Sequence, residues 1–140
     1  MSREWAGKAE TSDMARLVVE DLAAKHEGLF NWVGVYWVEG DEVVLGPYVG
    51  AYPEGHERIK IPQGVCGAVA ASGKTEVVPD VRKRPGHIAC EIATRSEVVA
   101  PISSGGEVIG VLDVDSNTPD AFDDALVAEI EEAAAAIAAG

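Results

Sequence analysis

Residues 31–38 read Asn-Trp-Val-Gly-Val-Tyr-Trp-Val, and residues 42–48 read Glu-Val-Val-Leu-Gly-Pro-Tyr. Both stretches are rich in aromatic and β-branched side chains, which favour strands. Between them stands Glu39-Gly40-Asp41, a tripeptide typical of a tight turn. The region therefore predicts a β-hairpin, from which the rest of the fold can be worked out.

A second hairpin is predicted by residues 97–102 and 107–115 around a turn at 103–106, and short strands are predicted at 59–61 and 76–78. Strands joined by hairpins are antiparallel, whereas a parallel sheet needs long crossover connections. The predicted class is therefore α+β, with a central, mostly antiparallel sheet of about six strands and with N- and C-terminal helices packed on one face.

Helices are predicted near both ends and once in the middle. Apolar residues recur at helical spacing over 13–27 and 122–138, and residues 64–72 are small and apolar. Three side chains of N-cap type stand before or at the start of the first helix: Thr11, Ser12 and Asp13. Residues 1–10 are predicted to form a flexible tail and residues 11–140 a single domain, as expected for a chain of 140 residues.

Composition excludes several classes of protein. A hydrophobic content of 47% is too high for a disordered chain, and no apolar run is long enough to span a membrane. A net charge of -13 repels phosphate backbones, so nucleic acid is not expected as a partner, whereas an amine is tolerated. The N-terminus lacks the apolar region of a secretory signal, and two cysteines make no disulfide framework. We therefore expect free thiols in a reducing cytoplasm.

Cys90 lies in the longest irregular stretch, residues 79–96, and long loops within compact domains are usually functional. His87 stands three residues before it. Four basic residues flank it as well: Arg82, Lys83, Arg84 and Arg95. Nearby cations lower the pKa of a thiol and make it reactive. The other interpretation, a buried structural cysteine beside a solvated basic loop, stays open on the local sequence.

Asp113 and Asp115 stand two residues apart near the end of a predicted strand, so both side chains are expected on one face. Carboxylates this close repel one another unless they bind a cation or share a proton. Glu97 begins the neighbouring predicted strand and would complete an acidic cluster beside a thiol. The alternative is a strand end at which the carboxylates are simply hydrated.

Trp32 and Tyr36 share a strand face, and Gly34 between them predicts a flat aromatic recess, with an aromatic core cluster as the alternative. Cys66 lies among small apolar residues and is interpreted either as a packing cysteine or as a thiol that resolves oxidised Cys90. The sequence contains no Walker, GxGxxG, GxSxG or HExxH motif. Its cysteines and histidines are too scattered for a zinc site, so no metal is expected.

Several segments carry a family resemblance together. They are NWVGVYWV (31–38), VVLGPYVG (43–50), GVCGAVAASGKTEVVPDV (64–81), PGHIACEIATRSEVVAPI (85–102), GEVIGVLDVDS (106–116) and Phe122-Asp123. The combination resembles the free methionine-(R)-sulfoxide reductases, which are stand-alone enzymes of the GAF fold. The resemblance implies a GAF-like fold and thiol-dependent reduction of free L-methionine (R)-sulfoxide to methionine.

The resemblance also implies a role for each candidate residue. Cys90 matches the catalytic cysteine, which is oxidised to a sulfenic acid. Catalytic roles are implied for Cys90, Glu97, Asp115 and Cys66. Contacts with the substrate are implied for Trp32, Tyr36, Asp113, Ile88 and Ala89. No tightly bound cofactor is implied, and the reductant is an external thiol, either a thioredoxin-type protein or a small molecule.

One segment departs from the family pattern. Typical members carry a resolving cysteine just before the Arg-Ile dipeptide that here occupies 58–59, but this chain has none, and His56 or a neighbour takes its place. Either Cys66 or a small thiol then resolves Cys90, or turnover is lost. Two other functions therefore stay open: a non-catalytic GAF domain that binds a small ligand, and a redox sensor with a reversible Cys66–Cys90 disulfide. The apolar terminal helices are compatible with a homodimer.

Overall fold

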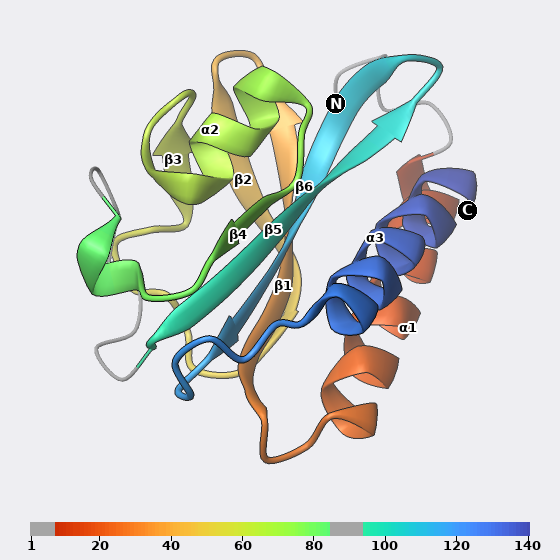
Figure 1. The fold of residues 1–140 in the computed structure, drawn as a ribbon. Coiled ribbons are helices and arrows are strands. Elements are labelled where there is room, and N and C mark those ends of the chain that lie inside the picture. The colour runs from red at the N-terminus through yellow and green to blue at the C-terminus, as the bar shows by residue number, and fades with distance from the viewer. Residues whose placement is uncertain (1–7, 85–93) are drawn as a thin grey trace.

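The computed structural model describes residues 8–84 and 94–140. Its strands form one six-stranded sheet in the order β3-β2-β1-β6-β5-β4, and every neighbouring pair is antiparallel (Figure 1). The strands are β1 (Phe30–Glu39), β2 (Glu42–Val49), β3 (Arg58–Lys60), β4 (Glu76–Val78), β5 (Ser96–Ser104) and β6 (Glu107–Ser116). Both predicted hairpins are confirmed, as is the predicted antiparallel α+β class.

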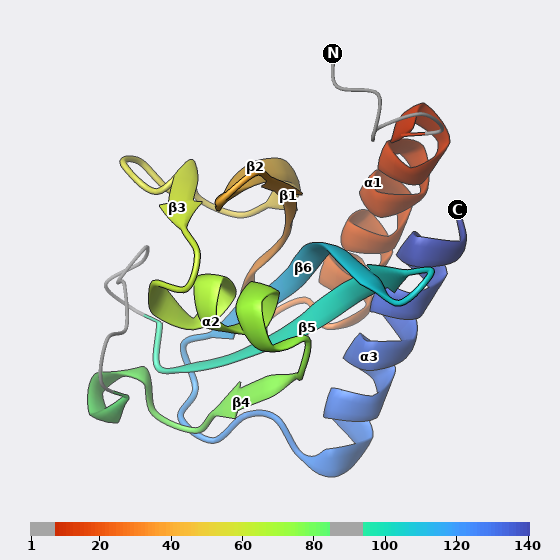
Figure 2. The ribbon, with the colours of Figure 1, turned by 90° about the horizontal axis from the view of Figure 1, so that it is seen from above.

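Helices cover the two faces of this sheet unequally. The long helices α1 (Lys8–Lys25) and α3 (Asp124–Ala139) lie side by side on one face, as predicted (Figures 1 and 2). The short helix α2 (Gly64–Ser72) lies on the opposite face, followed after β4 by a single 3₁₀ turn at Val81–Lys83. Within the described residues, no helix is long and apolar enough to cross a membrane.

The alternating side chains of β1 divide the interior into two hydrophobic clusters. Val33, Val35 and Trp37 pack under α1 and α3. Trp32 and Tyr36 point to the other face and pack with residues of α2 and β3. This alternation is the ordinary consequence of strand geometry, and it places the side chains of Trp32 and Tyr36 on the same face as α2.

Helix α1 begins at Lys8, so the prediction of a start at 13 and of a tail that includes residues 8–10 is wrong; residues 1–7 lie outside the described part of the chain. The predicted cap residues have other partners. The hydroxyl of Thr11 donates a hydrogen bond to the carbonyl of Gly140 (3.0 Å), and Asp13 pairs with Arg16 on the next turn. These residues therefore lie within the helix rather than at its start.

The other helix ends follow their local sequence more closely. Gly73 ends α2 in the left-handed conformation (φ 71°), and its N–H donates to the carbonyl of Val69 (2.8 Å). Asp123 caps α3 by accepting a hydrogen bond from the N–H of Leu126 (2.9 Å). As a result α3 begins at Asp124 rather than at the predicted 122.

Candidate active site

Three carboxyl side chains meet on the α2 face of the sheet. Glu97 on β5 lies directly opposite Asp115 on β6, and Asp113 stands two residues earlier on the same strand. Their exposed fractions are only 5%, 4% and 5% for Glu97, Asp113 and Asp115. The predicted cluster is therefore confirmed, and the alternative of a hydrated strand end is wrong.

The same register continues from β6 into β1. Trp32 lies opposite Asp115, and Gly34 lies opposite Asp113. The aromatic strand and the carboxyl strand are hydrogen-bonded neighbours, which brings the indole ring alongside the acidic cluster. Two features that are far apart in the sequence thus form one continuous patch on one face of the sheet.

The space above Gly34 is filled rather than open. A Cβ atom at this position would lie 2.2 Å from Cη2 of Trp32, so the indole covers the glycine. The ring stacks on Tyr48 (centroids 5.9 Å apart, planes 14° apart) and contacts Tyr36 (6.0 Å). The gap that a flat aromatic recess would need at Gly34 is filled by the indole, and Trp32 and Tyr36 belong to a buried cluster, which was the alternative interpretation. The wall of the site is an aromatic stack, to which Tyr48 adds a ring that the sequence analysis missed.

Two aromatic side chains hold the loop between β2 and β3. The indole Nε1–H of Trp32 donates to the carbonyl of Ala51 (2.9 Å), and the hydroxyl of Tyr36 donates to the carbonyl of His56 (3.1 Å). This is the segment in which the family's resolving cysteine is missing. Both acceptors are backbone atoms, so neither contact has a signature in the sequence.

Cys66 approaches the carboxyl cluster from helix α2. Its thiol forms a hydrogen bond with Asp113 and is buried. One ligand atom from each of Cys66, Glu97 and Asp113 lies within 4.8 Å of the other two. The helix can come this close to the chain before it because Gly67 has no side chain: a Cβ there would lie 2.8 Å from the carbonyl carbon of Pro62.

Burial raises the pKa of two carboxyl groups in the cluster. Loss of hydration raises the pKa of Glu97 well above its ordinary value, and the charge of Asp113 raises it further. The pKa of Asp113 is also raised well above its ordinary value, first by burial and then by the charge of Asp115, while the hydrogen bond from Cys66 acts in the opposite direction. A site of this kind can donate a proton near neutral pH.

The basic residues that flank Cys90 in the sequence have acidic partners in the structure. Arg84 makes two hydrogen bonds to Glu76, one of them 3.0 Å long. Arg95 and Arg82 both lie beside Asp80, at 3.4 and 3.7 Å. Most of the positive charge of the basic residues that flank Cys90 in the sequence is therefore neutralised by acidic partners. Arg84 nevertheless acts on the site, because its charge lowers the pKa of Glu97.

The segment that carries Cys90 lies outside the described residues, together with His87, Ile88 and Ala89. Its two ends are described. The N–H of Val81 donates to the carbonyl of Arg95 (2.7 Å), so the chain leaves and returns at neighbouring points. The returning end runs straight into Glu97.

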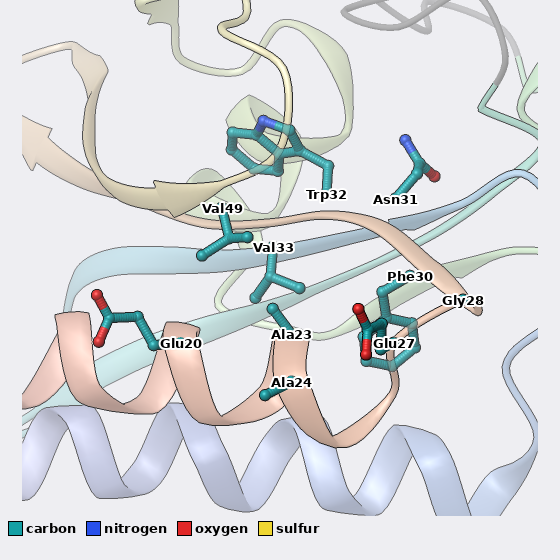
Figure 3. A pocket seen from close by; sticks show the side chains of 10 residues that line it. All are labelled: Glu20, Ala23, Ala24, Glu27, Gly28, Phe30, Asn31, Trp32, Val33 and Val49. Atoms are coloured by element: carbon teal, nitrogen blue, oxygen red, sulfur yellow. The ribbon is translucent and has the colours of Figure 1, made fainter.

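A separate hollow of about 410 Å³ lies between α1 and the strands β1 and β2. Figure 3 shows Ala23 and Ala24 on its helix side, and Trp32 across the β1 ribbon from them. Its acidic lining residues are Glu20 on α1 and Glu27 just after the end of that helix. Because this hollow is on the helix face, it is distinct from the carboxyl cluster.

Comparison with known proteins agrees with this arrangement. A family model for the GAF domain matches residues 8–140. The free methionine-R-sulfoxide reductase of Escherichia coli (strain K12) is 39% identical over 132 residues, which cover 88% of this chain and 78% of that protein. The chain belongs to the free methionine-(R)-sulfoxide reductase family of GAF domains. GAF domain-containing protein A of Dictyostelium discoideum is 44% identical over 116 residues, or 82% of this chain and 72% of that protein.

Solved structures of free methionine-(R)-sulfoxide reductases share the fold. The type II enzyme from Thermoplasma acidophilum superposes with a TM-score of 0.88 at 28% identity, covering 94% of this chain and 92% of that one. The enzyme from Neisseria meningitidis, solved in complex with its substrate, gives a TM-score of 0.85 at 37% identity, covering 92% and 76%. The chain spans between 53% and 78% of the length of its curated relatives.

Proposed function

We propose that this protein reduces free L-methionine (R)-sulfoxide to methionine, with Cys90 as the nucleophile. The observation that carries the proposal is the buried cluster of Glu97, Asp113 and Asp115 beside the Trp32 indole. Polar and apolar recognition are adjacent there, as an amino acid with a methyl sulfoxide requires. The names of the relatives support the same activity.

The first step moves one oxygen atom between two sulfur atoms. The Cys90 thiolate attacks the sulfoxide sulfur, and the sulfoxide oxygen takes up a proton. Rearrangement then leaves a thioether and a Cys90 sulfenic acid. The substrate sulfur gains two electrons and the Cys90 sulfur loses two, so no further co-reactant is needed at this step.

Glu97 and Asp115 supply the proton in this scheme. They face each other across β5 and β6 and share a hydrogen bond. Because the pKa of Glu97 is raised, the pair retains a proton at a pH where an exposed carboxyl would have lost it. Asp113 then receives the substrate's amino group, which restores a positive partner to a crowded acidic site.

The aromatic stack receives the methyl end of the substrate. Trp32 and Tyr36 form the wall next to the carboxyl cluster, and a ring face also attracts the partial positive charge of a sulfoxide sulfur. Ile88 and Ala89, just before Cys90 in the sequence, are proposed to contact the substrate as well. A carboxylate that binds the amino group favours a free amino acid, because a methionine within a peptide has no free amino group.

Cys66 is proposed to resolve the sulfenic acid. Its thiol condenses with the oxidised Cys90 to form a disulfide and one molecule of water, and an external dithiol then reduces that disulfide. Cys66 is supported in this role by its place at the carboxyl cluster. The cycle needs a supply of thiols, which a thioredoxin-type protein or a small thiol in the cytoplasm would provide.

Incubation with racemic free methionine sulfoxide and dithiothreitol, followed by separation of the isomers, tests the proposal. We expect the R isomer alone to disappear, and to persist with Cys90→Ser. Loss of both isomers, or turnover by Cys90→Ser, would contradict the mechanism. If the folded, reduced protein consumes neither isomer, the protein is a GAF domain that binds a small ligand without converting it.

A further inference from the structure

One sulfur atom and two carboxyl groups lie close together although they come from three different elements. They belong to Cys66 on α2, Glu97 on β5 and Asp113 on β6. All three residues are buried. The spacing of cysteines and histidines in the sequence does not predict this site, because the mixed set of ligands is brought together by packing. Buried acidic groups at this separation repel one another, and a cation among them would remove the repulsion.

A carboxyl oxygen of Asp113 lacks a hydrogen-bond partner in the described part of the molecule. Oδ1 of Asp113 is fully buried and accepts no hydrogen bond, although the other groups of the cluster surround its side chain. A buried carboxylate oxygen without a donor is costly. Such an atom is a ready ligand for a positively charged species that enters the site.

We propose that Cys66, Glu97 and Asp113 form a binding site for a zinc-type divalent cation. The thiolate selects a soft or borderline ion such as Zn²⁺ over Mg²⁺ or Ca²⁺, which prefer oxygen ligands alone. Ligand atoms on one tetrahedral zinc lie roughly 3.5 Å apart by ordinary bond lengths. The three ligand atoms lie within 4.8 Å of one another, so binding requires them to approach by about 1 Å at most. Three protein ligands leave the fourth position to water.

Binding converts the Cys66 thiol to a zinc-bound thiolate, and the thiol proton, together with any proton on Glu97 or Asp113, is released to solvent with no change in oxidation state. The bound ion is coordinated by Cys66 and Asp113 at the same time. If the proposed function holds, zinc is therefore a reversible inhibitor, because it occupies the resolving thiol and the carboxylate proposed for the substrate's amino group.

Cobalt(II) provides a readout that does not depend on turnover. The reduced protein is titrated with Co²⁺ in the presence of a phosphine reductant, and the sulfur-to-cobalt charge-transfer absorption is followed; Zn²⁺ is then added in competition. We expect one ion per chain and displacement of cobalt by zinc. Cys66→Ser should abolish the absorption band, and Asp113→Asn should weaken binding at least about tenfold.

Two matched variants serve as controls. Cys90→Ser removes the other thiol, and Glu129→Gln removes a carboxylate that pairs with His26 on the helix face, at 3.0 Å. Both should keep the band and the affinity. A band that survives in Cys66→Ser, depends on Cys90, or disappears in Glu129→Gln would overturn the proposal. Failure of the turnover assay leaves this measurement intact, so the two proposals are judged separately.

Discussion

The Trp32 indole lies against the backbone of Gly34, so closely that a Cβ at position 34 would lie 2.2 Å from Cη2. Gly34→Ala should therefore push the indole off its stack with Tyr48. We expect a loss of about 1–3 kcal/mol in the free energy of unfolding, because the site is overpacked, and a larger loss of kcat/KM for methionine sulfoxide. Chemical denaturation and steady-state kinetics measure the two effects.

Trp32→Phe provides the control for this prediction. The atoms that would clash belong to the six-membered ring of the indole, which Phe does not place in the same position. The added methyl group should then cost much less in the Trp32→Phe background than in the native one. Equal costs in both backgrounds would show that the glycine is needed for another reason.

The hydrogen bond from Tyr36 to the carbonyl of His56 predicts that loss of the hydroxyl affects substrate binding more than folding stability. Tyr36→Phe removes only the hydroxyl, which should cost about 0.5–1.5 kcal/mol of folding free energy. The β2–β3 loop should then exchange its amide hydrogens faster, and the KM for methionine sulfoxide should rise more than kcat falls. Unchanged exchange in residues 51–57 would contradict this role for the hydroxyl.

The buried carboxyl groups make a prediction about stability and pH. Because the pKa of Glu97 is raised in the folded state, its contribution to stability is complete below the ordinary pKa of about 4.3 and is lost as the pH rises through the folded value. Glu97→Gln should therefore be more stable than the native protein at neutral pH, by about 0.5–2 kcal/mol, and inactive. The advantage should shrink toward pH 4 in denaturation experiments; a difference independent of pH would be evidence against a raised pKa.

Arg84 should set the alkaline limb of the pH–rate profile. Its charge lowers the pKa of Glu97, so Arg84→Met should raise that pKa further and keep the proton donor protonated to higher pH. The alkaline limb of kcat should move upward in pH. Arg84→Lys keeps the charge and should leave the limb near its native position. A downward shift in Arg84→Met would exclude Glu97 as the group that must be protonated.

Cys66 makes a prediction about the oxidised protein. With methionine sulfoxide and no reductant, the native protein should lose two hydrogens in mass by forming a Cys66–Cys90 disulfide. Cys66→Ser should instead gain one oxygen, as a sulfenic acid on Cys90. Mass spectrometry after rapid acid quenching separates these products. A disulfide between two chains, or oxidation in the absence of methionine sulfoxide, would favour a redox sensor.

Much of this site could be predicted because strand periodicity is strong. The two-residue spacing of Asp113 and Asp115 gave a common face, and the hairpin pattern gave the neighbouring strands. That Glu97 faces Asp115 depends on register, which the position of the turn sets to within a residue. The family resemblance, rather than spacing alone, indicated that these carboxyl groups act together.

Other features had no local signature. The acceptors for Trp32 and Tyr36 are backbone carbonyls of a polar loop, and any residues there would supply them. The hydroxyl of Thr11 in α1 has its acceptor at Gly140, near the opposite end of the sequence. The compensation of Arg84 by Glu76 requires the three-dimensional path of the chain after β4. These relationships come from tertiary packing, which a short sequence window does not contain.

The order of the strands in the sheet determines which parts of the molecule open locally. The carboxyl groups lie on β5 and β6, inside the sheet, whereas both edges are three-residue strands, β3 and β4. Interior strands exchange their amide hydrogens through the rarest openings of a protein, and short edges and loops through frequent ones. The acidic floor of the site should therefore persist while the β2–β3 loop next to it opens and recloses many times. A small molecule could then enter and leave without the proton-holding groups ever losing their mutual arrangement.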